Sequence, residues 1–191
     1  MNSLVEQRRR KDEFFKASPY SPLLPEQQAK FEHLNYYDPD PALDFDLTPE
    51  EFAEKSNVKM QTSTGDTRYY QRWGKIRFPV DGQDSELTLF HAPGDSTFFV
   101  PFMDATSGKE TYGAGRYIET EHLPNGTVHV DFNEAYNPYC AYNEPLSLAA
   151  AAGREPRVWS CPIPPKENRL SVPIRAGEKK PEGDWFEPEH E

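Results

Sequence analysis

The side chains most able to do chemistry gather in three segments of the C-terminal half, residues 104–117, 131–143 and 161–170. These segments are dense in amides, phenols and guanidinium groups, which supply the hydrogen bonds that orient small molecules in pockets. We therefore expect this protein to bind a small polar or anionic molecule. The side chains expected to line its pocket are Arg116, Asn133, Tyr136, Asn137, Tyr142 and Arg169.

The first segment is rich in glycine. Gly108, Gly113 and Gly115 permit positive φ and let a ligand or a strand approach the backbone closely. Lys109 and Arg116 beside them could hold a carboxylate or a phosphate. The spacing is not that of a phosphate-binding P-loop. A tight turn beside a bulged strand accounts for the same glycines, and we favour that interpretation.

The second segment begins on a strand in which His129, Asp131 and Asn133 share one face and apolar residues occupy the other. A histidine and an aspartate at this spacing could bind a metal, or act as a base and its orienting group, if a third group arrives from elsewhere. A solvent-exposed face of an antiparallel sheet explains the pattern more simply. We therefore predict no metal site, and the sequence indicates no particular cofactor.

The two cysteines, Cys140 and Cys161, admit three interpretations. Free cysteine is among the most frequently buried residue types, so we predict two buried thiols. A disulfide ranks second and would close a loop of about twenty residues, worth roughly 3 kcal/mol. Catalysis and metal binding rank last, because no closely spaced ligand pair is present and only His129 is near enough in sequence to act as a base.

Two other classes of function remain open. A hydrolase would use Asp131 or Glu167 with His129 or Cys140 nearby, although no familiar hydrolase motif is present. That activity requires these groups to converge within hydrogen-bond distance around a cleft. In a purely structural or interaction module, the three segments would only hold the fold together.

Composition limits the partners. The chain has 191 residues and a net charge of -11, which repels phosphate backbones and anionic lipids, so we expect neither nucleic acid nor a membrane as a partner. No apolar run reaches the roughly 20 residues of a membrane span, and the N-terminus lacks the apolar core of a signal peptide. We therefore expect a cytoplasmic protein. The basic run at residues 8–11 is interpreted as a solvated helix face.

The N-terminal part predicts helices. Ser3 and Glu6 form a capping-box pattern at the start of a helix that continues through Ala17. Residues 26–34 predict one or two helical turns. A threonine followed by proline and two glutamates predicts a further short helix over residues 48–55.

From Val58 onward apolar and polar residues alternate between turn signals, which is typical of antiparallel hairpins. Residues 76–89 predict a hairpin around an Asp-Gly turn, and residues 97–103 predict the central strand because both faces are apolar. Residues 128–132 predict a strand that follows an Asn-Gly turn. Residues 170–176 predict a last strand, placed at a sheet edge by its proline.

These elements predict a mainly β fold, either a partly closed antiparallel barrel or a two-sheet sandwich, with an N-terminal helix. We expect one domain over residues 1–191. Within it, residues 1–56 pack on a β domain of residues 57–179, and residues 180–191 form an acidic tail. Residues 144–160 are interpreted as a surface insertion.

The irregular segments also resemble a known family. They read DATSGKETYGAGRY at residues 104–117, DFNEAYNPYCAYN at 131–143, CPIPPKENRL at 161–170 and IRAGEK at 174–179. Together with STGD at residues 63–66, they look like the prokaryotic family called domain of unknown function 1684. The resemblance implies a bacterial or archaeal protein and brings no established activity, cofactor or catalytic residue.

Overall fold

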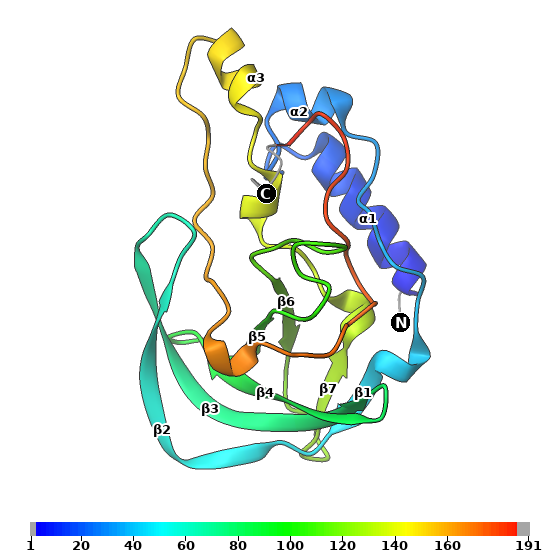
Figure 1. The fold of residues 1–191 in the computed structure, drawn as a ribbon, viewed down its shortest axis with the longest axis vertical. Helices are drawn as coiled ribbons and strands as arrows, with labels where there is room; N and C mark the ends of the chain where they lie inside the picture. The colour runs from blue at the N-terminus through cyan, green and yellow to red at the C-terminus, as the bar shows by residue number, and fades with distance from the viewer. Residues whose placement is uncertain (1–2, 187–191) are drawn as a thin grey trace.

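The computed structural model describes residues 3–186 and contains two antiparallel sheets (Figure 1). Strands β2 to β6 form the larger sheet in sequence order, and β1 pairs with β7 in the smaller one. The prediction of a mainly β fold is confirmed, and neither sheet closes into a barrel. The strands are β1 (Asp44–Leu47), β2 (Glu50–Gln61), β3 (Thr67–Val80), β4 (Gln83–His91), β5 (Phe98–Phe102), β6 (Arg116–Thr120) and β7 (Val128–Asp131).

The described α-helices are α1 (Leu4–Ala17), α2 (Pro25–Lys30) and α3 (Leu146–Ala151). The N-terminal helix begins as predicted, because the Ser3 hydroxyl accepts a hydrogen bond from the Glu6 amide at 3.3 Å. Within residues 3–186 no helix is long and apolar enough to cross a membrane.

The β3–β4 hairpin confirms the predicted Asp-Gly turn. Asp81 and Gly82 both have positive φ, at 49° and 76°, which is the backbone of a type I′ turn. The register that this turn sets places Ile76 opposite Leu87, so both side chains enter the core. The strand predicted as central is β5, but the middle of the larger sheet is occupied by β4.

The helix predicted over residues 48–55 is wrong, because residues 50–55 belong to β2. β2 pairs with β3, and the register shifts between Glu51 and Ser56. At Gly74 of β3 a Cβ atom would lie 2.6 Å from the Glu50 carbonyl oxygen, so only glycine lets the two strands approach this closely. Backbone pairing with a distant strand therefore overrides a local helix-start signal.

The last strand, predicted over residues 170–176, is also wrong: these residues form an extended strap without strand pairing. Val172, Ile174 and Ala176 are nevertheless buried, as the alternation predicted. The carbonyls of Ile174 and Ala176 accept hydrogen bonds from the Arg116 guanidinium instead of from a neighbouring strand. A side chain thus satisfies the backbone that a strand would have satisfied.

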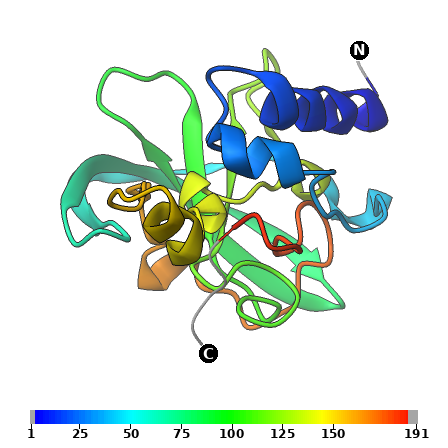
Figure 2. The ribbon, with the colours of Figure 1, turned by 90° about the horizontal axis from the view of Figure 1, so that it is seen from above.

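The buried apolar residues form two large clusters. The first lies between the sheets and the strap, and its members include Ile76, Phe78, Leu87, Leu89, Val100, Phe102, Val130, Phe132, Val172 and Ile174. The second joins the helices to the C-terminal segment through Phe15, Leu23, Phe31, Leu34, Tyr142 and Trp185. Figure 2 shows α1, α2 and the red C-terminal segment grouped together, away from the β2–β3 hairpin.

Candidate functional site

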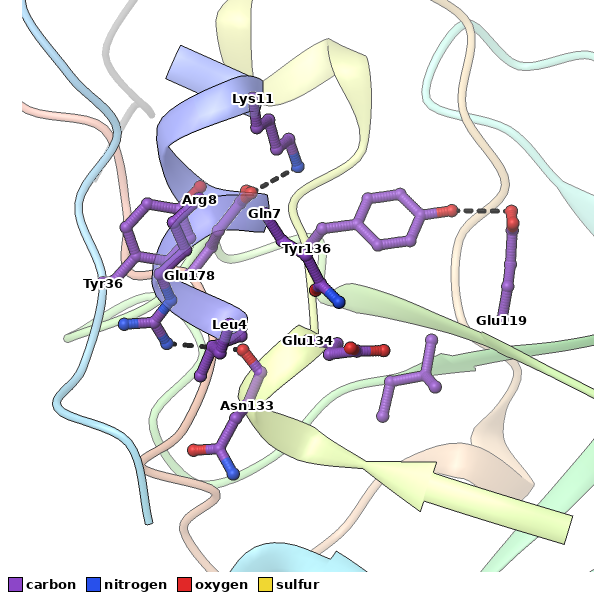
Figure 3. Close-up of a pocket in the computed structure, with 11 residues that line it drawn as sticks. Leu4, Gln7, Arg8, Lys11, Tyr36, Glu119, Asn133, Glu134, Tyr136 and Glu178 are labelled. Atoms are coloured by element: carbon purple, nitrogen blue, oxygen red, sulfur yellow. Dashed lines mark hydrogen bonds and ion pairs between the residues drawn. The ribbon is translucent and has the colours of Figure 1, made fainter. Parts of the chain in front are cut away.

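Two adjoining cavities share Tyr136 and Lys11. The first, of about 250 Å³, lies between α1 and the segment that follows β7, and we call it the helix cavity (Figure 3). The second, of about 570 Å³, extends from Tyr136 to Trp159 and Cys161, and we call it the aromatic cavity. Tyr136 is therefore the predicted ligand-binding residue that lines both.

The helix cavity receives one face of α1. Leu4, Gln7, Arg8 and Lys11 recur at helical spacing and line the cavity, and Figure 3 shows the Arg8 guanidinium directed toward Asn133 and away from Tyr136. The Tyr136 hydroxyl donates to Glu119 at 2.8 Å, which fixes the orientation of the ring between the two cavities.

Arg8 joins this face of α1 to the chain before β1. Its guanidinium lies 4.3 Å from the centroid of the Tyr36 ring and donates to the carbonyls of Tyr37 at 2.9 Å and Asn133 at 3.4 Å. Among the described residues, Arg8 Nε and the Tyr36 hydroxyl are buried without a hydrogen-bond partner. The helix cavity is therefore small and polar, and suits water or a small polar group.

Glu178 is the centre of a polar cluster at the wall of the helix cavity, which we define as Glu178, Lys11, Asn137 and Tyr142. Lys11 forms an ion pair with one carboxylate oxygen. The other oxygen accepts from the backbone N–H of Asn137 at 2.8 Å and from the Tyr142 hydroxyl at 2.7 Å. Burial and the adjacent Glu178 carboxylate raise the pKa of Tyr142 well above its usual value, so the phenol stays a donor.

The aromatic cavity has walls of four rings: Tyr117, Tyr136, Tyr139 and Trp159. The Tyr117 and Tyr136 rings meet edge to face, with centroids 5.8 Å apart. The Tyr139 and Trp159 rings make a second such pair at 5.2 Å. Two edge-to-face pairs leave ring faces and edges that can contact a flat apolar molecule.

Two cationic side chains border the aromatic cavity, Lys11 and Arg68. Arg68 donates to the Ser160 carbonyl at 2.8 Å, which holds its side chain toward this wall. Lys11 Nζ lies 5.0 Å from the centroid of the Tyr136 ring. Arg68 also lines a further cavity of about 240 Å³ that shares Tyr117 and Tyr136 with the aromatic one. Positive charge and aromatic surface therefore coincide here in a strongly acidic protein.

Cys140 and Cys161 are free and buried, which confirms the favoured prediction of two buried thiols. The Cys140 amide donates to Cys161 Sγ at 3.3 Å. A hydrogen bond from the Cys161 thiol lowers the pKa of Cys140 to about 7, and the same bond raises the pKa of Cys161. Cys161 also lines the aromatic cavity.

Arg116 is buried in a different part of the fold, beneath the strap. Its guanidinium donates to Asp104 at 2.9 Å, to the Ile174 carbonyl at 2.7 Å and to the Glu178 carbonyl at 3.1 Å, in addition to Ala176. Both terminal nitrogens are thus engaged by the protein itself, and only 1% of the side chain is exposed.

The other predicted ligand-binding residues are dispersed. Asn133 lines the helix cavity, but its amide exchanges two hydrogen bonds with the Asp40 backbone, at 2.7 and 2.9 Å. Asn137 and Tyr142 lie in the Glu178 cluster. Arg169 is exposed and lines neither the helix cavity nor the aromatic cavity.

His129 lies on the exposed face of β7, as the alternation predicted. Its Nδ1 lies 2.9 Å from Asp46 and its Nε2 lies 3.5 Å from Asp44, both on β1, and the Asp46 hydrogen bond raises the pKa of His129. Ligand atoms of Asp44, His129 and Asp131 lie within 4.8 Å of one another. β1 therefore supplies the third group near His129 and Asp131, although at an open surface.

The other members of the hydrolase hypothesis lie in separate clusters. Glu167 forms an ion pair with Arg72 at 2.6 Å and accepts from the Thr88 hydroxyl at 3.0 Å. Cys140 contacts Cys161. The structure does not bring these groups together with His129, so it assembles no hydrolytic centre from them.

Sequence reasoning missed most of the aromatic cavity. Lys11 belongs to the basic run that we interpreted as a solvated face, and Trp159 belongs to residues 144–160, which we interpreted as an insertion. Tyr139 lay in a selected segment without being chosen, and nothing in the sequence marked Arg68. One signal was available: Tyr139 and Trp159 each lie within two residues of a cysteine.

Comparisons with known proteins agree with the resemblance described above. The model of a family described as "Protein of unknown function (DUF1684)" matches residues 29–179. The solution NMR structure of an uncharacterized protein from Haloarcula marismortui is similar, with 35% sequence identity and a TM-score of 0.63 over 92% of this chain and 91% of that one. No curated protein matches.

Proposed function

The chain belongs to the family described as protein of unknown function (DUF1684), and because that description assigns no ligand, we propose one from the geometry. We propose that this protein binds a small anionic molecule with a flat apolar body in the aromatic cavity. The observation that carries this proposal is the coincidence of four aromatic rings and two cationic side chains around about 570 Å³.

The size and lining of the cavity suit such a molecule. Pockets for small ligands usually have volumes of about 300–1,000 Å³, mostly apolar walls and a few polar groups that fix orientation. Tyr139 and Trp159 offer ring surface for stacking. Arg68 supplies a planar guanidinium, which binds a carboxylate through paired hydrogen bonds.

The overall charge strengthens the choice of an anion. A net charge of -11 repels anions from most of the surface, so an anionic ligand needs a local site of positive charge. Arg68 and Lys11 provide one at the border of this cavity. Lys11 is shared with Glu178, so Arg68 is expected to supply most of the attraction.

The test is a comparison of matched ligands by thermal denaturation and tryptophan fluorescence. Benzoate and 2-naphthoate are compared with their neutral amides, since each pair differs only in charge. A ligand at 100 times its Kd stabilises the folded state by about 2.7 kcal/mol, which raises Tm measurably. We expect the carboxylates to raise Tm and the amides to do so much less.

Fluorescence locates the site. The chain has three tryptophans, and Trp159 lines the aromatic cavity whereas Trp73 packs against the main core. Ligand-dependent quenching is expected to persist in Trp73→Phe and to disappear in Trp159→Phe. Equal responses to acids and amides, or no response at millimolar ligand, would contradict the proposal.

A further inference from the structure

Cys140 and Cys161 are neighbours in space although 21 positions separate them in the chain. The Cys140 amide donates to Cys161 Sγ at 3.3 Å, and the two thiols hydrogen-bond to each other. Both remain free thiols. The bond from the Cys140 amide to Cys161 Sγ places the two cysteines side by side, which is the first requirement for a bond between their sulfur atoms.

The segments that carry the two sulfurs are anchored separately. The Cys161 amide donates to Ser63 Oγ at 3.1 Å, and the Ser63 amide donates to the Cys161 carbonyl at 2.9 Å, so the loop between β2 and β3 holds Cys161. The Tyr112 hydroxyl donates to Cys140 Sγ at 3.5 Å. The placement of the two cysteines beside each other is therefore maintained by the fold.

The two thiols differ in reactivity. Hydrogen bonds from Cys161 and from Tyr112 stabilise the thiolate of Cys140 and lower its pKa to about 7. The thiolate is the nucleophilic form, so Cys140 is the sulfur that reacts first. Cys161 keeps its proton, and it is the sulfur that lines the aromatic cavity.

The surroundings favour redox chemistry over hydrolysis or metal binding. Within residues 3–186 the hydrogen-bond partners of the two cysteines include no histidine, so a nucleophile here has no histidine as its base. In the part of the chain that the structure describes, the one set of side chains placed closely enough to bind a metal ion is Asp44, His129 and Asp131, and it includes neither cysteine. Both thiols are less than a tenth exposed, which admits a small oxidant and hinders a bulky one.

We propose that Cys140 and Cys161 form a redox-active dithiol, in which a hydroperoxide oxidises Cys140 and Cys161 then closes a reversible disulfide. First, the Cys140 thiolate attacks a peroxide oxygen and the O–O bond breaks. Cys140 becomes a sulfenic acid, and the leaving oxygen takes up a proton. Next, the Cys161 sulfur attacks the Cys140 sulfur, the S–O bond breaks and water leaves with the Cys161 proton. Two thiols lose two electrons and two protons, and one hydroperoxide is reduced.

The disulfide would restrict the motion of side chains that line the aromatic cavity. Tyr139 adjoins Cys140 in sequence and Trp159 lies two residues before Cys161, and their rings are in contact. A covalent bond between the cysteines would fix these two rings relative to each other. This chemistry needs no ligand in the cavity, so it can be tested separately from the proposed function.

The experiment exposes the reduced full-length protein to one equivalent of hydrogen peroxide. We expect titratable thiols to fall from two to none, the intact mass to fall by two hydrogen atoms, and dithiothreitol to restore both. The species is expected to remain unlinked to other chains on a non-reducing gel. The proposal would be overturned by disulfide-linked dimers or by a mass gain of two oxygens. It would also be overturned if both thiols remained titratable in the peroxide-treated protein after unfolding.

Single variants assign the roles. In Cys161→Ser, Cys140 is expected to accumulate as a sulfenic acid that dimedone traps. In Cys140→Ser, trapping at Cys161 is expected to be slower, because burial still raises the pKa of the Cys161 thiol and so lowers its thiolate fraction. Faster trapping at Cys161 would reverse the assignment. If a variant fails to fold, trapping on the wild-type protein followed by peptide mass mapping identifies the sulfur that reacts first.

Discussion

The aromatic cavity and the buried polar network around Arg116 and Glu178 both combine cationic and phenolic side chains, but they differ in whether open space remains beside those side chains. In the network, the guanidinium and carboxylate groups bind backbone carbonyls, an amide and a phenol. In the aromatic cavity, ring surfaces and the Arg68 side chain border a space of about 570 Å³. A high density of polar residues in the sequence therefore indicates where the fold forms internal hydrogen bonds. It does not by itself predict an open cavity.

The largest effect is expected on the network side of this comparison. Arg116→Met would leave the Asp104 carboxylate buried without its cation, and the carbonyls of Ile174, Ala176 and Glu178 without this donor. Removing one partner of a buried ion pair typically costs about 3–5 kcal/mol. Urea denaturation should show this loss. Arg175→Met is the control, because its pair with Glu110 is largely exposed and should contribute little to stability.

A result in which Arg116→Met folds with nearly unchanged stability would break the comparison, since it would mean that the guanidinium does not hold the strap. The double variant Asp104→Asn with Arg116→Met should recover part of the loss, because it removes the unpaired buried charge.

The second effect concerns the Glu178 cluster. Glu178→Gln keeps an oxygen for the Asn137 amide and Tyr142 hydroxyl but turns an amide donor toward the Lys11 ammonium. We expect a loss of about 2 kcal/mol by thermal or urea denaturation. Lys11→Met removes the ammonium that faces this amide donor. It should therefore lower stability less in the Glu178→Gln background than in the wild-type protein. Strict additivity of the two changes would show that Lys11 and Glu178 are not coupled.

The third prediction addresses the cavity side. Arg68→Gln should weaken binding of the aromatic carboxylates about tenfold or more, because a charge-assisted hydrogen bond contributes about 1.5–3 kcal/mol. Its stability without ligand should change by about 0.5 kcal/mol at most, because Arg68 is exposed. Calorimetric titration of this variant beside Arg175→Gln provides the comparison. Equal losses of affinity in both variants would indicate a general effect of charge and not a site at Arg68.

The smallest effect is expected at His129, which belongs to neither region. Hydrogen bonding to Asp46 raises the pKa of His129 in the folded protein. Its stabilising contribution is therefore complete below the ordinary histidine pKa and is lost as the pH rises through the raised value. Because the pair is about half exposed, the change should be about 0.5 kcal/mol. The free energy of unfolding, measured by denaturation at several pH values across this range, should depend less on pH in His129→Gln than in the wild type. An identical pH dependence in both proteins would show that the pair of His129 and Asp46 does not cause it.

The prediction of the fold succeeded where short-range signals agree with long-range packing. Alternation and an Asp-Gly pair defined the β3–β4 hairpin, because turn geometry sets strand register locally. The strap also kept its predicted buried face at Val172 and Ile174. It is not a strand, since Pro173 has no amide hydrogen to donate and Arg116 satisfies the carbonyls.

The site was predicted less completely. Tyr136 was selected and does line both cavities, whereas Arg116 and Tyr142, chosen for the same chemical reasons, are buried among internal partners. Selection by residue type finds side chains capable of binding. It does not reveal whether another part of the same chain already occupies them.

The sequence by itself determined the β character of the chain, the Asp81–Gly82 hairpin, the N-terminal helix and an acidic surface, because periodicity, turn chemistry and charge depend on residues close together in the chain. The tertiary structure alone decided that residues 50–57 belong to a strand, that the two cysteines lie side by side, and that side chains from positions 11, 68, 136 and 159 border one cavity. Those features depend on hydrogen bonds and packing between distant segments, and no local pattern encodes which segments will meet.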